Sequence, residues 1–427
     1  MEKNKKTLAV IGLGYVGLPL ALLADKNGYK VYGIDTDEEK VKKINSKSSP
    51  FKDEAISEKL KDASLLATSD FKKIGEAEII AICVPTPVYE DHTPNLEPVK
   101  SVCAEIAPYL RIGQLVILES TVNPGVSEEV VLPILEEISG LKAGEDFYLA
   151  HCPERINPGD GKWSVANIPR VVGSLEERGL EMALHFYRSI ISAGIRPMGS
   201  LKEAESVKIV ENSFRDVNIA FVNELAMSFS KLGIDITNVI AGASTKPFAY
   251  MPHFPGCGVG GHCIPVDPYY LIEYAHKNGF EHHFLRLARR INNYMPEFTV
   301  ERVAEALNEK KIPLNGSKVV VLGLAYKGDI DDTRESPSFD IIKSLKRWGA
   351  EVSVFDPYIP DKSTAKSLEE ALKGADAVIL ATPHSAFKEI TPAFLSENKV
   401  GVLVDGRNFF AKDDFLEAGI VYKGIGR

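Results

Sequence analysis

A cysteine beside a run of glycines is the most chemically distinctive feature of the sequence. Residues 254–267 read FPGCGVGGHCIPVD, so four glycines precede Cys263 and Asp267 follows it. Glycine lets several backbone N–H groups converge on an anion such as a diphosphate. A cysteine thiolate attacks carbonyl carbon, and nearby N–H groups or a cation increase the thiolate fraction. The stretch therefore predicts an anion-binding loop beside a nucleophile, the alternative being that Cys263 is a buried structural cysteine.

Two neighbours of Cys263 are weaker candidates for chemistry. Cys257 lies inside the glycine loop. No acid is placed after Cys257 in the way that Asp267 is placed after Cys263. His262 lacks the HxH or HExxH spacing that marks a metal site. We therefore expect a local structural role for His262 and no bound metal.

Further polar residues have placements that suit catalysis. Lys208 and Asn212 are four residues apart in a helical pattern, so they share one helix face. A buried lysine can stabilise an oxyanion there, whereas an exposed lysine is a solvated charge. Glu154 with Arg155, and residues 120–121, each follow an apolar run. Catalytic groups of α/β proteins lie at such carboxyl ends of strands.

A glycine motif near the start of the sequence indicates a dinucleotide. Gly12, Gly14 and Gly17 form a GxGxxG pattern between a predicted strand and a predicted helix. They allow a tight turn, close approach of the backbone to a pyrophosphate, and close packing of helix on strand. Asp35 ends the next predicted strand, where a carboxylate binds a ribose diol and repels a 2′-phosphate. The motif predicts NAD rather than NADP, the alternative being a glycine-rich turn that binds nothing.

Apolar runs and helical patterns alternate along the first part of the chain, and these elements must position the polar residues. The predicted strands are 7–12, 31–35, 78–84, 115–119 and 147–150, and residues 15–27 have a helical pattern. Strands that are apolar along their whole length are buried on both faces, as in a parallel sheet. The alternation therefore predicts a doubly wound α/β domain.

A long helical segment occupies the middle of the chain. Helical spacing of apolar residues runs from Glu203 to about Leu232, and residues 281–306 are also helical in pattern. The apolar stripe consists of Val207, Val210, Phe214, Val217, Phe221, Leu225 and Phe229. Such a stripe belongs either to the core or to an interface with a second chain, and we expect a homodimer, with higher assembly left open.

The last part of the sequence repeats the first. TLAVIGLGY at residues 7–15 corresponds to KVVVLGLAY at 318–326, and KVYGID at 30–35 corresponds to EVSVFD at 351–356. Further strands are predicted at 377–382 and 400–405. A second Rossmann-like unit follows from this repeat. The three predicted segments are 1–200, 201–312 and 313–427.

Composition limits the class of protein. The chain has 427 residues, of which 44% are hydrophobic and 26% charged, as in globular proteins of about three domains. The net charge of −9 argues against nucleic acid or an anionic membrane as partner. The five cysteines form no CxxC pair, so we expect reduced thiols and a cytoplasmic location. The uncharged run 8–24 contains glycines and a proline, which favours strand, turn and helix over a signal peptide.

Taken in order, the motifs resemble those of the UDP-glucose/GDP-mannose dehydrogenase family over nearly the whole chain. The resemblance rests on GxGxxG, CVPTP (83–87), STVNPG (120–125), PERINPGD (153–160), AESVKIVEN (204–212), the cysteine loop and YKGDIDDTRESPS (326–338). TKPF at 245–248 and GHCIP at 261–265 are most similar to members that act on UDP-N-acetylglucosamine. The family loop commonly reads PGPG, and Cys257 replaces its second proline.

The resemblance implies two Rossmann-like doubly wound parallel-sheet domains joined by a central helical dimerisation region. It implies NAD-dependent, four-electron oxidation of a UDP-N-acetylhexosamine, foremost UDP-N-acetylglucosamine, at the 6-hydroxymethyl group, through a thiohemiacetal and a thioester on Cys263. UDP-N-acetylmannosamine, UDP-N-acetylgalactosamine and UDP-glucose are alternative substrates for the same chemistry. The remoter alternatives are a two-electron hydroxyacid dehydrogenase, which would not need Cys263, and a non-catalytic nucleotide-sugar sensor.

Roles for individual residues also come from the resemblance. Cys263 would be the nucleophile, Lys208 would stabilise the oxyanion and Glu154 would be the base for hydrolysis. Asp267, Asn212 and Thr121 would orient water or the alcohol, and the division of base duty among Lys208, Asp267 and Glu154 is open. The implied NAD-binding residues are Gly12, Gly14, Tyr15, Val16, Gly17, Asp35, Val84, Pro85, Thr86, Ser120, Thr121 and Arg334. The implied UDP-sugar-binding residues are Glu154, Arg155, Lys208, Asn212, Arg215, Lys246, Phe254, Gly256, Gly258, Gly260, Gly261, Lys327 and Arg407.

Overall fold

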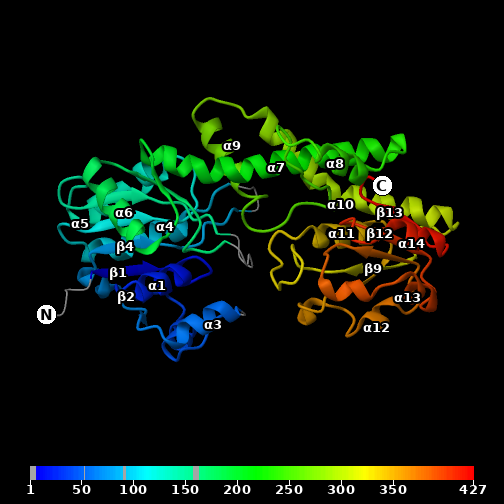
Figure 1. The fold of residues 1–427 in the computed structure, drawn as a ribbon, viewed down its shortest axis with the longest axis horizontal. Helices are drawn as coiled ribbons and strands as arrows, with labels where there is room; N and C mark the ends of the chain where they lie inside the picture. The colour runs from blue at the N-terminus through cyan, green and yellow to red at the C-terminus, as the bar shows by residue number, and fades with distance from the viewer. Residues whose placement is uncertain (1–5, 52, 90–92, 157–162) are drawn as a thin grey trace. The chain divides into compact units, whose positions relative to one another are not determined.

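The computed structural model describes residues 6–51, 53–89, 93–156 and 163–427 (Figure 1). The chain divides into two compact units. The first unit comprises Met1–Glu211 and Tyr269–Asn278, and the second comprises Asn212–Pro268 and Gly279–Arg427. In the described residues, no helix combines the length and the apolar character that crossing a bilayer requires.

The first unit is built on an eight-stranded sheet of order β3-β2-β1-β4-β5-β6-β7-β8. Its strands are β1 (Thr7–Ile11), β2 (Lys30–Ile34), β3 (Leu66–Thr68), β4 (Ile79–Ile82), β5 (Leu115–Leu118), β6 (Tyr148–His151), β7 (Arg170–Ser174) and β8 (Ile195–Pro197). All neighbouring pairs are parallel except β6 and β7, which are antiparallel. Strands β3, β7 and β8 lie outside the strands that the sequence predicted.

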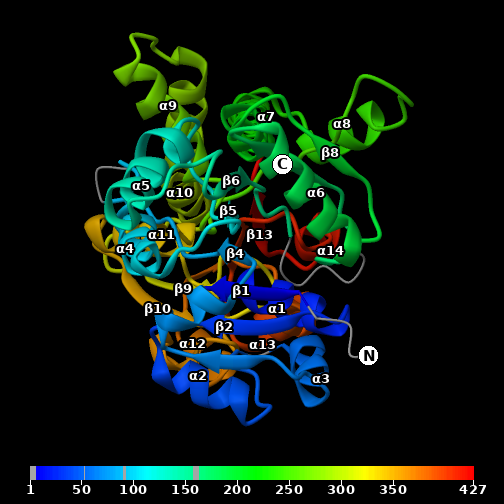
Figure 2. The same ribbon diagram turned by 90° about the vertical axis from the view of Figure 1, so that its left-hand side faces the viewer.

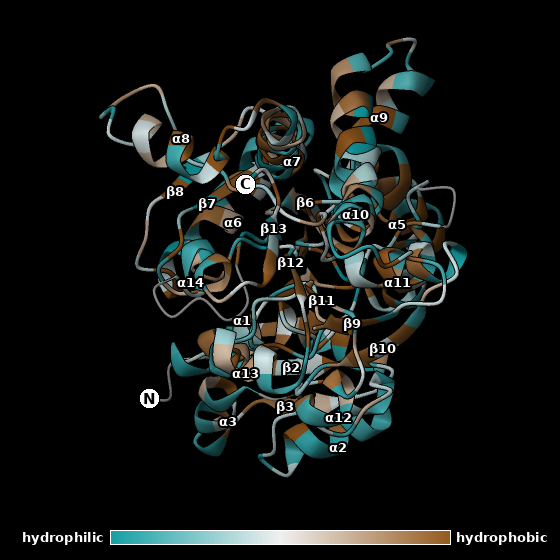
Figure 3. Cartoon of the chain, turned by 90° about the vertical axis from the view of Figure 1, so that its right-hand side faces the viewer, coloured by the Kyte–Doolittle hydropathy of each residue, from teal (hydrophilic) through white to brown (hydrophobic). Residues whose placement is uncertain are grey.

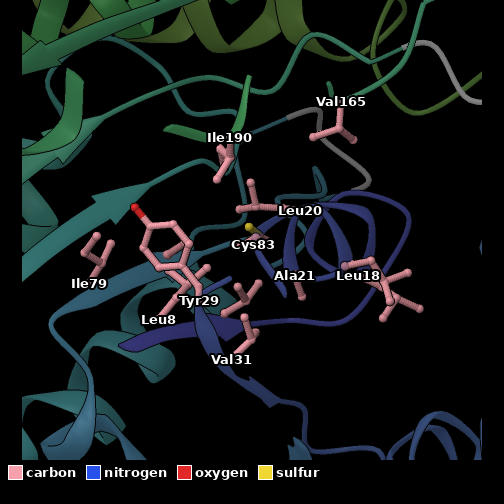
Figure 4. Close-up of a cluster of buried hydrophobic side chains, with 14 of the residues drawn as sticks. Leu8, Leu18, Leu20, Ala21, Tyr29, Val31, Ile79, Cys83, Val165 and Ile190 are labelled. Carbon is pink, nitrogen blue, oxygen red and sulfur yellow. The ribbon is translucent and has the colours of Figure 1, made fainter. Parts of the chain in front are cut away.

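Helices cover both faces of this sheet, because successive side chains of a strand point to opposite faces and both sets are apolar. The helices are α1 (Gly17–Lys26), α2 (Glu38–Asn45), α3 (Glu54–Lys61), α4 (Glu97–Ile106), α5 (Leu132–Ser139) and α6 (Glu177–Ile190). On one face, Leu8 and Val10 of β1 pack in a core with residues of α1 and α6 (Figures 2 and 4). On the other face, Ala9 and Ile11 pack with residues of α4 and α5.

The predicted long helix is confirmed, and it begins two residues earlier than its pattern indicated. It is α7 (Leu201–Leu232), and the other helices of the middle of the chain are α8 (Ile236–Ala243), α9 (Asp267–Lys277) and α10 (His283–Glu309). The first helix begins at Gly17 rather than at Tyr15, because the residues after Gly12 form the turn that leads into it.

The second unit contains a fully parallel five-stranded sheet of order β10-β9-β11-β12-β13. Its strands are β9 (Lys318–Leu322), β10 (Glu351–Phe355), β11 (Ala377–Leu380), β12 (Val402–Asp405) and β13 (Val421–Gly424). The helices after α10 are α11 (Pro337–Arg347), α12 (Leu368–Leu372), α13 (Pro392–Glu397) and α14 (Lys412–Glu417). Strand β11 is apolar along its length, and strand β9 is apolar after its first residue, Lys318 (Figure 3). The predicted fold class, two parallel-sheet α/β domains with a central helical region, is confirmed.

The internal repeat is visible in the backbone geometry. The order β2-β1-β4-β5 of the first sheet recurs as β10-β9-β11-β12 in the second. Gly12 has a φ of 88° and its N–H donates to the Ile34 carbonyl at 2.8 Å. Gly323 has a φ of 92° and donates to the Phe355 carbonyl at 2.9 Å. The third motif glycine also recurs, as Gly328, so Ala325 is the replaced position.

Substitution of Gly323 tests how much the second unit depends on this turn. A Cβ at Gly323 would lie 2.3 Å from Cβ of Thr382, in addition to the unfavourable positive φ. Gly316 has a φ of 82° with nothing within 4 Å of such a Cβ. We expect Gly316→Ala to lower the free energy of unfolding by about 1–2 kcal/mol. Gly323→Ala should cost about 1–3 kcal/mol more. Equal urea midpoints for the two variants would contradict the packing argument.

Candidate active site

The GxGxxG loop has the geometry that a dinucleotide requires. A Cβ at Gly17 would lie 2.0 Å from the Gly12 carbonyl oxygen, and a Cβ at Gly12 would lie 2.6 Å from the Cys83 carbonyl oxygen. Those two glycines are therefore fixed by packing. A Cβ at Gly14 would meet nothing within 4 Å. The backbone at Gly14 is thus open for a pyrophosphate at the start of α1, where helix N–H groups favour an anion.

Asp35 follows β2 and is buried, with its carboxylate tied to the glycine loop. Its Oδ2 accepts hydrogen bonds from the Leu13 N–H at 2.8 Å and from Nζ of Lys40 at 2.7 Å. Its Oδ1 accepts from the Asp37 N–H at 3.0 Å. Lys40 was missed by the sequence analysis, although a lysine five residues after the ribose acid was a visible signal. Lys40 adds a cation to the predicted ribose site.

The loops after β4 and β5 are bonded to each other beside the glycine loop, since both strands follow β1 in the sheet. Ser120 Oγ donates to the Val84 carbonyl at 2.7 Å, and Thr86 Oγ1 donates to the Thr121 carbonyl at 2.7 Å. Tyr270 also donates to the Thr86 carbonyl. The structure thus brings together the predicted NAD residues of this edge. Three other predicted NAD-binding residues lie in the loop after β4 and in the glycine loop. Pro85 is exposed and Val16 directly precedes α1. The ring of Tyr15 stacks on that of Phe51, with ring centroids 4.4 Å apart.

Glu154 follows β6 and is held on both carboxylate oxygens. Oε1 accepts the N–H groups of Arg155 and Ile156, each at 2.6 Å. Oε2 accepts from Nη2 of Arg170 at 2.5 Å, and Arg170 is fully buried. The side chain of Arg155 pairs with Glu211 of α7 and donates to the Pro169 carbonyl. Arg170 was not among the predicted residues, because it lies on a strand that the sequence analysis did not identify.

Lys208 lies on α7 and is buried, so it is not a solvated surface charge. One turn earlier, Glu205 accepts the N–H groups of Gly125 and Ser127 at 2.6 and 2.8 Å. Burial raises the pKa of Glu205 to about 7. Glu205 therefore ties the loop after Thr121 to the helix that carries Lys208, a contact that nothing in the local sequence pattern indicated.

Exposure separates Cys263, which lies in the second unit, from the other four cysteines. All five cysteines are described, and Cys263 is partly exposed while the other four are buried. Burial raises the pKa of Cys103 and Cys152 to about 12, and it raises the pKa of Cys257. The Cys263 carbonyl accepts the Val266 and Asp267 N–H groups at 3.1 and 2.8 Å, so Cys263 stands at the N-terminal turn of α9. A helix N-terminus favours a thiolate.

Asp267 and Asn212 meet although they are far apart in the sequence. Asn212 Nδ2 donates to Asp267 Oδ2 at 2.5 Å, and both side chains are buried. The sequence predicted a role for each residue but not their contact. The pair holds a carboxylate one helical turn after Cys263, at the start of α9.

The glycines of the cysteine loop are fixed by close packing within the second unit. A Cβ at Gly256 would lie 2.8 Å from Nη1 of Arg407, one at Gly258 2.7 Å from Pro337, and one at Gly260 2.7 Å from Tyr326. Cys257 donates its N–H to the Gly406 carbonyl at 2.9 Å, which a proline could not do. The loop therefore gains from this bond the restraint that the family's proline would supply.

The remaining predicted residues lie on the surface of the second unit. The guanidinium of Arg334 pairs with the carboxylate of Asp332, and this contact helps to lower the pKa of Asp332. The backbone carbonyl of Arg334 accepts the Gly261 N–H at 3.0 Å. Arg407 donates to the Gly258 carbonyl at 3.2 Å. The exposed ones are Arg215, Lys246, Phe254 and Lys327. His262 is exposed, and the described residues contain no group of His, Cys, Asp or Glu side chains placed to hold a metal ion.

Comparison with known proteins gives the family. The NAD binding domain of the UDP-glucose/GDP-mannose dehydrogenase family matches residues 6–191, the central domain 202–294 and the UDP binding domain 320–412. The chain belongs to this family. It is an NAD-dependent nucleotide-sugar dehydrogenase, so the predicted cofactor and enzyme class are confirmed.

Individual relatives cover almost the whole chain. A UDP-N-acetyl-D-mannosamine dehydrogenase of Pyrococcus horikoshii is 38% identical over 98% of this chain and 99% of its own length. A UDP-N-acetyl-D-glucosamine 6-dehydrogenase of Pseudomonas aeruginosa is 37% identical over 90% of this chain and 92% of its own length. The solved structure of a UDP-D-ManNAc dehydrogenase from Pyrococcus horikoshii superposes with a TM-score of 0.93, covering 99% of both chains at 37% identity.

Gly14→Ala should weaken NAD binding without harming the fold. The added methyl group meets no protein atom but projects where the pyrophosphate must approach the backbone. We expect NADH affinity, measured by fluorescence titration, to fall at least about tenfold, which is about 1.4 kcal/mol. The melting temperature should stay near that of the unsubstituted protein. Gly194→Ala, also with open space at its Cβ, is the control and should leave NADH affinity unchanged.

Proposed function

We propose that this enzyme oxidises the 6-hydroxymethyl group of a UDP-N-acetylhexosamine to a carboxylate in two successive steps, with the sugar covalently held on Cys263 between them. The observation that carries the proposal is the placement of Cys263. It is the partly exposed cysteine of the chain and stands at the N-terminus of α9, one turn before the buried pair of Asp267 and Asn212. Bound NAD supplies the hydride acceptor for each oxidation.

The first oxidation needs a group that accepts the alcohol proton and a cation that stabilises the alkoxide. Stabilisation of the alkoxide is assigned to Lys208, because a buried ammonium group interacts strongly with a developing negative charge. Asp267 and Asn212 are assigned the orientation of the hydroxyl group or of water, together with Thr121. The division of base duty among Lys208, Asp267 and Glu154 is left to pH-dependent kinetics of the variants.

The covalent step keeps the reactive aldehyde from escaping. The Cys263 sulfur forms a bond to the aldehyde carbon, and the carbonyl oxygen takes up a proton to give a thiohemiacetal. Loss of that proton and of the carbon-bound hydride produces a thioester. Water then adds to the thioester carbon while Glu154 accepts its proton, and the carbon–sulfur bond breaks with its electron pair returning to the Cys263 sulfur.

Binding of the ligands is assigned by segment. The glycine loop, Asp35, Lys40, the loops after β4 and β5, and Arg334 are proposed to hold NAD. The UDP-sugar is assigned to Glu154, Arg155, the cysteine loop, Lys327, Arg407, Arg215 and Lys246, since two phosphates on a chain of net charge −9 require clustered cations. The segments 1–200, 201–312 and 313–427 remain the proposed domains for NAD, catalysis and UDP-sugar.

The hexosamine epimer is a separate proposal. The motifs favour UDP-N-acetylglucosamine, and UDP-N-acetylmannosamine is the second candidate because its dehydrogenase from Pyrococcus horikoshii is similar over a larger share of the chain. Epimers differ by a few pocket contacts of about 1–3 kcal/mol each. Relative kcat/KM for UDP-glucose, UDP-N-acetylglucosamine and its mannose and galactose epimers decides between them.

Stoichiometry tests the four-electron reaction. We expect two NADH for each UDP-sugar consumed, with Cys263→Ala abolishing formation of the acid because no thiohemiacetal can form. Absorbance of NADH and chromatography of the sugar products measure both quantities. Cys103→Ala, which removes a buried thiol of α4, should retain two NADH per sugar. One NADH per substrate, or full turnover by Cys263→Ala, would reject the proposal.

We further propose that α7 forms the interface of a homodimer. Three members of its apolar stripe are exposed: Val210 by 57%, Phe214 by 48% and Phe221 by 56%. They are spaced by four and seven residues, so they share one helix face. A contiguous apolar helix face on a protein of this size fits an interface between copies of the chain.

Charge placed on this helix face should dissociate the dimer. We expect sedimentation of the unsubstituted protein to give twice the chain mass, and Phe221→Glu to shift it toward the monomer because burial of a carboxylate is unfavourable. Ile112→Glu is the control, since Ile112 is a 75% exposed apolar residue outside α7. A monomeric unsubstituted protein, or a dimer that Phe221→Glu leaves intact, would refute the interface.

A further inference from the structure

The loop that carries Lys327 is the second unit's counterpart of the dinucleotide loop, but it leads into no helix. In the first unit, Val16 is followed by Gly17, the first residue of α1. Lys327 and Gly328 occupy these two places in the second unit. The next helix, α11, begins only at Pro337. The backbone hydrogen bonds of a helix therefore do not order the residues around Lys327, and other groups have to do so.

A buried imidazole bonds to the residues after Lys327. His384 follows β11, and its side chain has no exposed surface. Its Nδ1 accepts the Asp329 N–H at 2.9 Å, so Nδ1 carries no proton and the proton of the ring lies on Nε2. Nε2 donates to Oδ2 of Asp356 at 3.0 Å. The ring of Tyr358 stacks on the imidazole with ring centroids 4.7 Å apart, so the imidazole is fixed in one orientation and one tautomer.

The start of the loop is fixed by two buried side chains that follow β10 and β11, the strands on either side of β9. Oδ2 of Asp356 accepts the N–H groups of Leu324 and Ala325 at 2.6 and 3.1 Å. Oγ1 of Thr382 donates to the Ala325 carbonyl at 2.5 Å. The backbone is therefore held up to two residues before Lys327.

The other end of the loop is fixed at Asp329, two residues after Lys327. Asp329 has a φ of 61°, in a region that residues other than glycine rarely adopt. Besides its N–H bond to His384, Oδ1 of Asp329 accepts the N–H and the hydroxyl group of Ser385 at 2.8 and 2.9 Å. Lys327 is thus an exposed cation between two restrained ends. Such an arrangement favours binding of an anion, because little conformational freedom is lost when the anion binds.

We propose that His384 is a positioning residue for the UDP-sugar, because its two ring nitrogens hold the loop in the conformation that presents Lys327 to the diphosphate. This inference rests on the proposed assignment of Lys327 to the UDP-sugar. In the first unit, the equivalent acid Asp35 is predicted to accept a hydrogen bond from a ribose hydroxyl group. In the second unit, the imidazole donates to Asp356 in the place of that hydroxyl group. A former ribose position thus orders a loop for a different ligand.

Two substitutions separate the two contacts of the imidazole. Asparagine places its amide oxygen where Nδ1 lies, so His384→Asn keeps an acceptor for the Asp329 N–H. Glutamine places its NH₂ group where Nε2 lies, so His384→Gln keeps the donor to Asp356 but loses the acceptor. We expect His384→Gln to weaken UDP binding about tenfold and His384→Asn to weaken it less than about threefold. Calorimetric titration of the full-length protein with UDP, in the absence of NAD, measures both affinities.

Lys327→Met shows whether the effect passes through Lys327. This substitution should itself weaken UDP binding about tenfold. In its background, His384→Gln should cost less than about a further twofold, because the two residues act as one unit. Thr299→Val is the matched control, since it removes a buried hydroxyl group of α10 that is bonded to the Met295 carbonyl. Its UDP affinity should equal that of the unsubstituted protein.

Hydrogen exchange at the Asp329 amide, followed by mass spectrometry of overlapping peptides, is a second measurement that needs no variant. The amide should be protected before UDP is added, because the imidazole already holds it. Free exchange without UDP, followed by protection when UDP is added, would overturn the inference.

The titrations give further outcomes that contradict the inference. It fails if His384→Gln leaves UDP affinity unchanged, if His384→Asn and His384→Gln weaken it equally, or if the loss in His384→Gln is undiminished in the Lys327→Met background. Unchanged UDP affinity in Lys327→Met alone would reject the assignment of Lys327 and the inference with it. One NADH per UDP-sugar would instead reject the proposed four-electron reaction without altering any of the UDP titrations.

Discussion

Burial of both faces of each parallel sheet is the constraint on which the rest of the structure depends. Alternate residues of β1 pack into two different cores, so neither face has room for polar chemistry. Polar side chains are therefore restricted to the carboxyl ends of the strands and to the loops that follow. Asp35 after β2, Glu119 after β5 and Glu154 after β6 all occupy such positions.

Charges at these ends are costly when buried, and the molecule compensates them with side chains distant in sequence. Arg170 is provided by β7, the strand that runs antiparallel to β6. Its guanidinium satisfies two carboxylates from neighbouring strands, and Tyr187 satisfies one of them again. The second unit uses the same principle. Asp356 after β10 accepts a hydrogen bond from the Leu324 N–H, and the same carboxylate is hydrogen-bonded to Nε2 of His384. The repeated fold thus keeps a buried acid at the same place in both sheets.

The surroundings of this buried acid differ between the two copies of the fold. In the first unit the acid, Asp35, has a lysine beside it and lies by an open glycine. In the second unit the acid is hydrogen-bonded to His384, and the buried Ala325 takes the place of the open glycine. The second copy therefore retains the turn but closes the ribose position. This difference agrees with a dinucleotide motif that is complete in the first unit alone.

The sequence by itself determined the alternation of strands and helices, the internal repeat, the glycine motif with Asp35, and the long helix α7, because each depends on residues close in the chain. Tertiary structure alone decided which cysteine is accessible, the contact of Asn212 with Asp267, and the cluster of Glu119, Glu154 and Arg170. Burial and long-range pairing depend on which strands become neighbours. No periodicity in a single segment records that choice.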